Sequence, residues 1–367
     1  MGDKHNLTLG YDWEKLDSIP LTPDLPSPYH TGTAYNLQNL YFANTNEQIQ
    51  VPIFHSRWKS YSYFAQLQSQ INEEFSTTLG LRYDKTSIYQ STFNPRLSLV
   101  YQPAQDLALK ISYGEAFFAP SAESRFRLFG SFSGQDEAGL YQSTFFQLPN
   151  EHLEPETLKT LEFGWTQLFS EQWMLQADIY FNQLDSIIQP TFNQPTLSDY
   201  FSGGNIAFTQ TNNNSGKLKS NGFDMTVTYQ IEQSTHGDLN AWLNLSYVDG
   251  TKRSFNQETK LPYTSSSKVR LGATWLYAGW EISPVARWQS ESSLSEQDSS
   301  LEKSVNDFGV VDLFIQRKDV LPNLDLYLDI NNLLNNSYGV AGEGSETTFE
   351  QVPQLKRWSS LGIRYHF

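Results

Sequence analysis

The sequence contains no cysteine, no long apolar run and no excess of positive charge. Without cysteine, the chain can form neither a disulfide framework nor a thiolate metal site. No apolar run approaches the ~20 residues that a membrane-spanning helix needs. Asp and Glu number 40 against 25 Lys and Arg, which argues against nucleic acid as a partner, because phosphates favour basic surfaces.

Recognisable catalytic motifs are also missing. There is no P-loop, no G-x-S-x-G and no H-E-x-x-H. The six histidines, at 5, 30, 55, 152, 236 and 366, give no Ser/His signature. Two acidic groups lack the spacing of a calcium loop: Glu151, Glu154 and Glu156, and Glu291, Glu296 and Asp298. We therefore expect no enzyme, no cofactor and no specific metal site.

Aromatic residues, by contrast, make up 14% of the chain. They recur in segments where apolar and polar residues alternate, namely 75–84, 107–114, 173–181, 223–229, 239–247, 269–277, 324–330 and 361–367. Strict alternation is typical of a strand with one apolar and one polar face. The apolar faces repeatedly begin or end on Tyr, Trp or Phe, as expected of aromatic girdles at two membrane interfaces.

The connections between these segments alternate in length. Short links are predicted near 72–74, 102–106, 169–172, 232–237, 278–279 and 318–323. Mostly long polar links are predicted near 14–56, 85–94, 115–158, 185–218, 249–266, 289–306 and 335–355. Short periplasmic turns and long extracellular loops are typical of an outer-membrane barrel. The sequence thus predicts an all-β, transmembrane, antiparallel up-and-down barrel of roughly 14 strands, the first near 5–13 and the last near 357–367.

Two other architectures also produce alternation. A passive porin of roughly 14 strands is permitted by the even strand number. A soluble secreted β adhesin would bury its apolar faces against a second layer, although connections as long as 14–56 are uncommon in compact domains.

Several stretches resemble the β-barrel of TonB-dependent outer-membrane receptors, in that family's order. They are "TTLGLRYD" (77–84), "FNPRLSLVYQP" (93–103), "KISYGEAFFAPS" (110–121), "NEHLEPETLKTLEFGWTQLF" (150–169), "MLQADIYFNQLDSIIQP" (174–190), "NSGKLKSNGFDMTVTY" (214–229), "LDINNLLNNSY" (328–338) and the terminal "GIRYHF". The resemblance implies a bacterial outer-membrane receptor that takes up a scarce nutrient, most readily a ferric siderophore. A haem receptor of the same family is the alternative.

Family members carry a plug domain inside a 22-stranded barrel, and neither a plug nor a TonB box is visible in this sequence. Nor do its opening residues contain the apolar core of a signal peptide. We therefore expect residues 1–367 to be the C-terminal part of the barrel, with about eight strands elsewhere. TonB would act only through the missing plug, and the lipid and lipopolysaccharide of the outer membrane would surround the wall.

Candidate ligand contacts lie in the long loops, where aromatic and polar residues interleave: Arg125, Arg127, Phe129, Tyr141, Tyr200 and Phe201. Haem receptors of the family carry a histidine between the motifs matched here at 117–120 and 150–153. His152 is the candidate iron ligand, although it falls inside the second motif. The alternating end of the chain resembles the signal read by the barrel assembly machinery, carried by Leu361, Ile363, Tyr365 and Phe367.

Overall fold

The computed structural model describes residues 4–18, 38–41, 48–51, 56–130, 134–135, 137–138, 141–193, 204–232, 234–254, 257–294, 304–342 and 351–367. Its strands are β1 (His5–Ser18), β2 (Gln38–Tyr41), β3 (Gln48–Val51), β4 (Ser56–Gln70), β5 (Phe75–Thr86), β6 (Thr92–Ala104), β7 (Leu107–Phe118), β8 (Phe129–Gly130), β9 (Gly134–Gln135), β10 (Tyr141–Leu148), β11 (Glu156–Leu168), β12 (Trp173–Asn193), β13 (Gly204–Ile231), β14 (Asp238–Ser254), β15 (Gln257–Lys260), β16 (Ser267–Tyr277), β17 (Trp280–Gln289), β18 (Ser292–Ser293), β19 (Ser304–Val305), β20 (Phe308–Leu321), β21 (Leu324–Asn331), β22 (Gly339–Ala341), β23 (Gln351–Pro353) and β24 (Trp358–Tyr365). One short helix is described, α1 (Ala122–Phe126).

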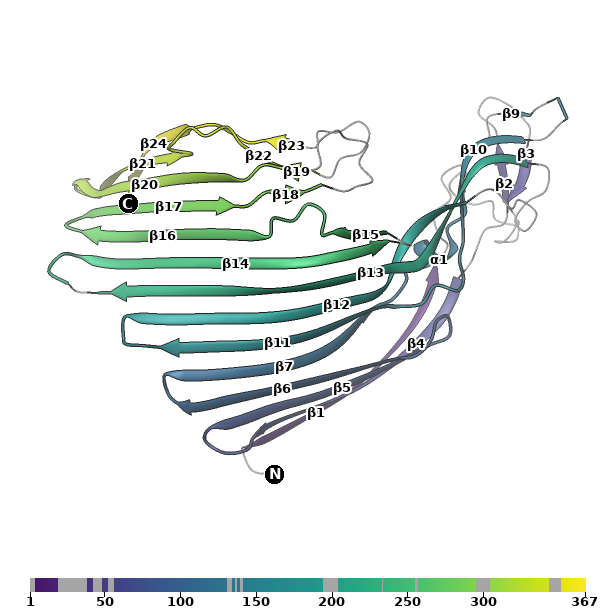
Figure 1. The fold of residues 1–367 in the computed structure, drawn as a ribbon, viewed down its shortest axis with the longest axis horizontal. Coiled ribbons are helices and arrows are strands. Elements are labelled where there is room, and N and C mark those ends of the chain that lie inside the picture. The colour runs from purple at the N-terminus through teal and green to yellow at the C-terminus, as the bar shows by residue number, and fades with distance from the viewer. Residues whose placement is uncertain are drawn as a thin grey trace.

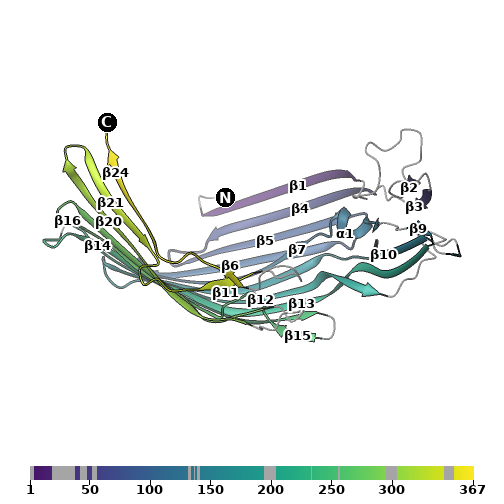
Figure 2. The ribbon, with the colours of Figure 1, turned by 90° about the horizontal axis from the view of Figure 1, so that it is seen from above.

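Fourteen long strands form one antiparallel wall in chain order (Figure 1). The pairing runs β1-β4-β5-β6-β7-β11-β12-β13-β14-β16-β17-β20-β21-β24. Figure 2 shows that this wall is curved and open, with β1 and β24 at its two edges. The predicted up-and-down architecture and strand number are confirmed. Within the part of the chain that the structure describes, no helix has the length and apolar character to cross a membrane.

The connections alternate as predicted, but several strands are longer than the sequence pattern indicates. Short turns join β4 to β5, β6 to β7, β11 to β12, β13 to β14, β16 to β17 and β20 to β21. The longer connections gather at the opposite end of the wall (Figure 1). The expected loop at 185–218 is mostly strand, because β12 continues to Asn193 and β13 begins at Gly204. Likewise, β1 continues to Ser18, beyond the end that the sequence predicts near residue 13.

The cross-strand register separates the wall into two faces. The apolar face carries residues such as Leu79, Leu81, Ile111 and Phe163, of which 39–47% of the surface is exposed. One row on this face consists of four directly paired aromatic residues on neighbouring strands, Tyr11, Tyr63, Tyr83 and Phe93. The polar face carries the alternate residues, including Arg82, Arg96, Lys110, Asp178, Arg270, Arg287, Asp325, Asp329 and Arg364. A sheet with one apolar and one polar side fits a membrane barrel wall.

Glycines on the polar face lie beneath large side chains of the adjacent strand. Four of them are directly paired with an aromatic residue: Gly10 with Phe64, Gly222 with Tyr180, Gly272 with Trp242 and Gly362 with Tyr327. A Cβ added to any of the four would lie 1.9–2.7 Å from the ring or a neighbouring carbonyl oxygen. Since glycine alone leaves this space, each ring lies flat along the wall.

A buried carboxylate ties the last strands together at the short-turn end. Asp325 is 4% exposed. It accepts hydrogen bonds from Gln316 Nε2 at 2.8 Å and from the Asp319 main-chain N–H at 3.0 Å, and it lies 3.1 Å from His366 Nε2. These contacts join β20, β21 and the end of the chain. On the other face, Leu361, Ile363, Tyr365 and Phe367 are all more than half exposed.

Candidate ligand-binding site

The described parts of the segment between β7 and β11 pack against the far end of β13. In it, β10 pairs in parallel with the far end of β13, from Tyr141 opposite Gly204 to Leu148 opposite Thr211. Helix α1 lies beside this pair (Figure 1). The small core beneath it is apolar, with Phe126, Leu128, Phe146 and Leu153 all buried. A hydrophobic core of this kind gives a long connection a defined shape.

Arg125 holds this folded connection together. The Arg125 residue is 3% exposed, and its guanidinium donates to the carbonyl oxygens of Glu151 and Leu153. The main-chain N–H of Asn150 in turn donates to the Arg125 carbonyl oxygen at 2.8 Å. Burial lowers the Arg125 pKa, and the nearby carboxylates of Glu154 and Glu151 oppose that shift. Arginine remains charged in proteins, so these are charge-assisted hydrogen bonds.

Three consecutive asparagines on β13 anchor the same connection. Asn212 Nδ2 donates to the Ser124 carbonyl oxygen at 3.0 Å, which fixes α1. Asn213 Oδ1 accepts from Asn150 Nδ2 at 3.2 Å. Asn214 bonds the main chain of Glu154 twice, as acceptor from its N–H and donor to its carbonyl oxygen, both at 2.8 Å. The asparagine run therefore joins the tip of the wall to the segment that Arg125 organises.

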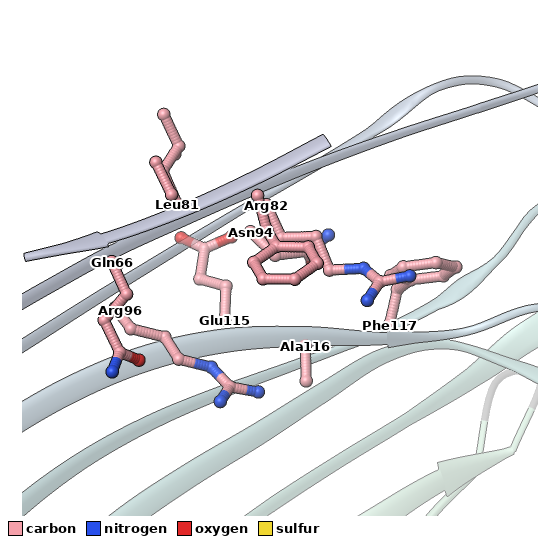
Figure 3. A pocket seen from close by; sticks show the side chains of 11 residues that line it. Gln66, Leu81, Arg82, Asn94, Arg96, Glu115, Ala116 and Phe117 are labelled. Carbon is pink, nitrogen blue, oxygen red and sulfur yellow. The ribbon is translucent and has the colours of Figure 1, made fainter. Parts of the chain in front are cut away.

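A pocket of about 460 Å³ lies on β4, β5, β6 and β7, and we call it the wall pocket. Figure 3 shows Arg82, Arg96 and Asn94 among the side chains that line it. Phe64 and Gln66 of β4 share the polar face with these residues. The lining thus combines two cationic groups, two amides, two aromatic rings (Phe64 and Phe117) and one carboxylate, that of Glu115. With the cationic groups in excess, this set suits an anionic ligand that also carries aromatic or apolar surface.

The two arginines of the wall pocket differ in their partners. Arg82 donates to Asp84 Oδ1 at 2.8 Å and Oδ2 at 2.9 Å, and its Nη2 lies 3.1 Å from Ser62 Oγ. The Asp84 carboxylate is buried and also accepts from Ser62 Oγ at 2.6 Å. Arg96 forms no ion pair with another described residue, and it is exposed. Arg96 therefore offers its charge to a ligand, while Arg82 is held in place.

Tyr89 links the wall pocket to the folded connection. It lies in the short link between β5 and β6, where the neighbouring Gln90 N–H donates to Glu154 Oε2 at 3.1 Å. Burial raises the Tyr89 pKa, and the carboxylates of Asp84 and Glu14 add to the shift, while Arg125 opposes it. Asp84 of the wall and Arg125 of the connection thus both lie close enough to Tyr89 to influence the charge of its phenol.

A second basic region lies across the wall on β16 and β17. A pocket of about 180 Å³ is lined by Lys268, Arg270, Arg287 and Tyr338, among others. Arg287 Nη2 lies 3.3 Å from Tyr338 Oη and 3.8 Å from Asp312 Oδ2. Both arginines are on the polar face, directly opposite one another in the register. The polar face therefore carries cationic groups at two separated places.

The structure places the sequence-predicted contacts as follows. Arg125 is buried, and Arg127 is half-buried with Nε 3.1 Å from Glu123 Oε1. Phe129 of β8 is opposite Gln147 of β10, and Tyr141 of β10 is opposite Gln135 of β9; only the main chain of Phe129 and Tyr141 is described. His152 is exposed, and its main-chain N–H donates to Asn150 Oδ1 at 3.0 Å. Tyr200 and Phe201 lie outside the described residues.

The sequence analysis brought five of these residues into one connection, but it missed their supports and gave the wall pocket no role. The Asn212 to Asn214 run and Tyr89 were not singled out. The run of three adjacent asparagines is itself the signal that could have found this anchor, because asparagine readily bonds main-chain groups. Arg82 and Arg96 each alternate with apolar residues in the sequence, but only the register brings them into one pocket.

An open antiparallel wall with one apolar face, long connections at one end and a cationic polar face defines part of an outer-membrane-type barrel. The family model for the β-barrel of TonB-dependent receptors matches residues 1–333. The chain belongs to the TonB-dependent receptor family.

Relatives and solved structures agree with this assignment. A hemin receptor of Yersinia enterocolitica is 25% identical over 198 residues, which cover 50% of this chain and 27% of that protein. A variant of the ferric enterobactin receptor of Pseudomonas aeruginosa matches with a TM-score of 0.64 and 17% identity, over 100% of this chain and 52% of that one. The FrpB iron transporter of Neisseria meningitidis matches with a TM-score of 0.63 and 15% identity, over 100% and 53%. The chain thus spans about half the length of these structures.

Proposed function

We propose that this chain forms part of the wall of an outer-membrane receptor that imports a scarce nutrient by the TonB-dependent route. Membership of the family and the division of the wall into an apolar and a polar face support this function. In such a barrel the apolar face contacts lipid and the polar face encloses the passage. The protein acts as a receptor and transporter, not as an enzyme, a passive porin or a soluble adhesin.

The receptor's other parts are included in this proposal. The wall has two unpaired edges among the described strands, β1 and β24, and further strands completing a 22-stranded barrel would cover both. TonB would act through a plug held inside that barrel. The exposed alternating residues of β24 suit recognition by the barrel assembly machinery. The protein's location is then the bacterial outer membrane, with no nucleic acid among its partners.

The ligand that best fits the polar face is an anionic iron chelate, a ferric siderophore. The observation that carries this choice is the wall pocket, where exposed Arg96 and the fixed Arg82 lie beside the ring of Phe64. Cationic groups attract the negative charge of a chelate, and the ring covers its apolar surface. The second basic pocket, around Arg270 and Arg287, extends the same preference across the wall.

Haem is a second candidate, favoured by the similarity to a hemin receptor and by one residue. His152 is exposed in the connection, four residues before the start of β11, and imidazole is a common haem iron ligand. Its position beyond the wall pocket would make it a first contact from the outside.

The test uses the complete receptor that carries this chain, purified in detergent. Binding of ferric catecholate and ferric hydroxamate siderophores is followed by tryptophan fluorescence, and binding of haem by its absorption spectrum. Reversing the charge with Arg96→Glu should weaken siderophore binding at least about ten-fold. The control is Lys219→Glu, an equal charge reversal at an exposed position of β13 on the face away from the pocket.

The two ligands give different outcomes. Equal binding by wild type and Arg96→Glu, for every chelate in the panel, would contradict the siderophore assignment. Loss of the haem spectrum in His152→Ala, with siderophores unable to bind the wild type, would favour haem instead. Failure to bind either class would reject both.

A further inference from the structure

Three lysines lie together on the apolar side of the wall, beyond its aromatic row. Lys15, Lys59 and Lys85 come from the adjacent strands β1, β4 and β5, near the end that carries the long connections. All three are exposed. We call them the rim lysine cluster.

The register places these lysines against one another and not against acids. Lys15 and Lys59 are directly opposite, and Lys85 is opposite Tyr61. Like charges directly opposite one another disfavour a sheet. Within the described residues, none of the three forms an ion pair. The nearest acid on this face, Asp17, is bonded by Arg57 Nε at 2.9 Å. The cluster therefore keeps its positive charge in a protein of formal net charge -15.

Two other lysines on the same side of the wall form ion pairs. Lys159 Nζ lies 3.8 Å from Glu115 Oε1, and Lys217 Nζ lies 2.7 Å from Asp185 Oδ1. These two come from β11 and β13, with their acidic partners on the neighbouring strands β7 and β12. The lysines of the rim cluster differ from these two, because no described acid is paired with them.

The cluster borders a hollow. A pocket of about 320 Å³ is lined by Lys15, Lys59, Lys85, Arg57, Tyr61 and Ser87, among others. Ser87 is fixed there by its main chain, since its N–H donates to the Lys59 carbonyl oxygen at 3.3 Å. Ammonium groups, a guanidinium, a hydroxyl and a phenol around one hollow are donors suited to phosphate oxygens.

The height of the cluster above the aromatic residues of these strands matches that of lipid head groups. The outermost described aromatic residues on this face of β1 and β4 are Trp13 and Tyr61, which are directly opposite one another; Lys85 is level with Tyr61, and Lys15 and Lys59 lie two residues beyond the pair. At ~3.4 Å per residue and a tilt of about 45°, two residues correspond to about 5 Å above that pair. Aromatic girdles mark the boundary of the hydrocarbon, and each polar layer outside it is several ångströms thick, about 5–7 Å for an ordinary bilayer.

We propose that the rim lysine cluster binds the phosphate groups of a lipid in the outer leaflet, the phosphorylated lipid A portion of lipopolysaccharide. The inference rests on the outer-membrane placement proposed above, and it adds a lipid site outside the passage. Its occupant is fixed by charge and position: an anion anchored in the membrane reaches the hollow from below while its acyl chains cover the apolar face.

The test compares two triple variants of the complete receptor in lipid nanodiscs. K15Q/K59Q/K85Q removes the cluster. K159Q/K217Q/K219Q removes the same number of charges from the same side of the wall, from lysines on β11 and β13. Native mass spectrometry measures binding of bisphosphorylated lipid A and of the same lipid after removal of its phosphates. We expect the first variant to bind phosphorylated lipid A on the order of 100-fold more weakly, from roughly five-fold per lysine, and the second less than about three-fold more weakly.

Three results would overturn the proposal: equal weakening in both variants, equal binding of the dephosphorylated lipid by the wild type, or displacement of lipid A by inorganic phosphate alone.

Heat-modified mobility on gels checks that each variant is folded. If the triple variant does not fold, Lys59→Gln replaces it. In lipid-free detergent this single change removes a like-charge contact and should not lower the unfolding temperature, while added lipid A should raise that temperature less than in the wild type. Equal stabilisation of both would contradict the proposal. Nutrient binding, measured in parallel, should stay unchanged, which separates this test from that of the transport function.

Discussion

Replacement of Arg125 by alanine separates a structural role for this residue from direct contact with a ligand. The substitution removes two charge-assisted hydrogen bonds, to the carbonyl oxygens of Glu151 and Leu153. Each such bond contributes about 1.5–3 kcal/mol. Because the two carbonyls lie in a connection that can open to water, we expect the lower part of the summed range, about 3–4 kcal/mol of local stability.

Hydrogen exchange of the Asn150 amide measures this loss. That N–H is bonded to the Arg125 main-chain oxygen at 2.8 Å, a bond that the alanine variant can still form. A local loss of about 3–4 kcal/mol corresponds to exchange faster by roughly 150-fold to 1000-fold when opening is local. Amides of β7, such as that of Ile111, should not change, because they belong to the wall and not to the connection.

A neighbouring arginine provides the control. Arg127→Ala disrupts an ion pair with Glu123 whose side chains are 29% and 42% exposed. Pairs of this kind contribute about 0.3–0.5 kcal/mol, so exchange at Asn150 should change by less than about three-fold. The reasoning would be refuted by normal protection of Asn150 in Arg125→Ala together with lost ligand binding. That result would place the Arg125 guanidinium on the ligand.

Three further substitutions test other parts of the structure. Asn214→Ala removes three side-chain bonds of 2.8 Å, two of them to Glu154. We expect about 2–3 kcal/mol of local loss and faster proteolysis near 150–155, and a wild-type cleavage rate would argue against the anchor. Asp325→Asn replaces a buried acceptor of several hydrogen bonds with a group that also donates. It should cost about 1–3 kcal/mol and lower the temperature at which folded gel mobility is lost; an unchanged temperature would contradict this. Gly222→Ala puts a methyl group 2.2 Å from a carbonyl oxygen, an overpacking of about 1–3 kcal/mol. Folded yield should fall, but not in Gly309→Ala, where the nearest atom is 3.7 Å away.

The strands could be predicted from the sequence because alternation is a local property. Each membrane-facing segment repeats its pattern every two residues, and each short turn interrupts it, so fourteen strands in chain order followed directly. The pattern weakens where a strand leaves the lipid, since its outward residues no longer need to be apolar. This is why the upper parts of β12 and β13, which include Asp185 and Lys217, were expected to be loop.

The site was less predictable because its contacts join distant segments. Arg125 binds carbonyls 26 and 28 residues further along the chain, and Asn212 reaches Ser124 across 88 residues. No periodicity records such pairings. Aromatic and basic composition indicated the correct connection, but the sequence could not distinguish an arginine that organises it from one that meets a ligand. Burial decides that, and burial depends on the parallel pairing of β10 with β13, which nothing in the local pattern indicates.

The glycines beneath Phe64, Tyr180, Trp242 and Tyr327 have a consequence for the passage of the proposed receptor. A ring that lies flat occupies little depth, whereas a ring that stands upright would project away from the wall on its polar side. In the proposed receptor these positions would therefore help to set the width of the passage. Bulkier residues at the glycine positions would tilt the rings inward and narrow the channel, even where the charges that attract the ligand are untouched.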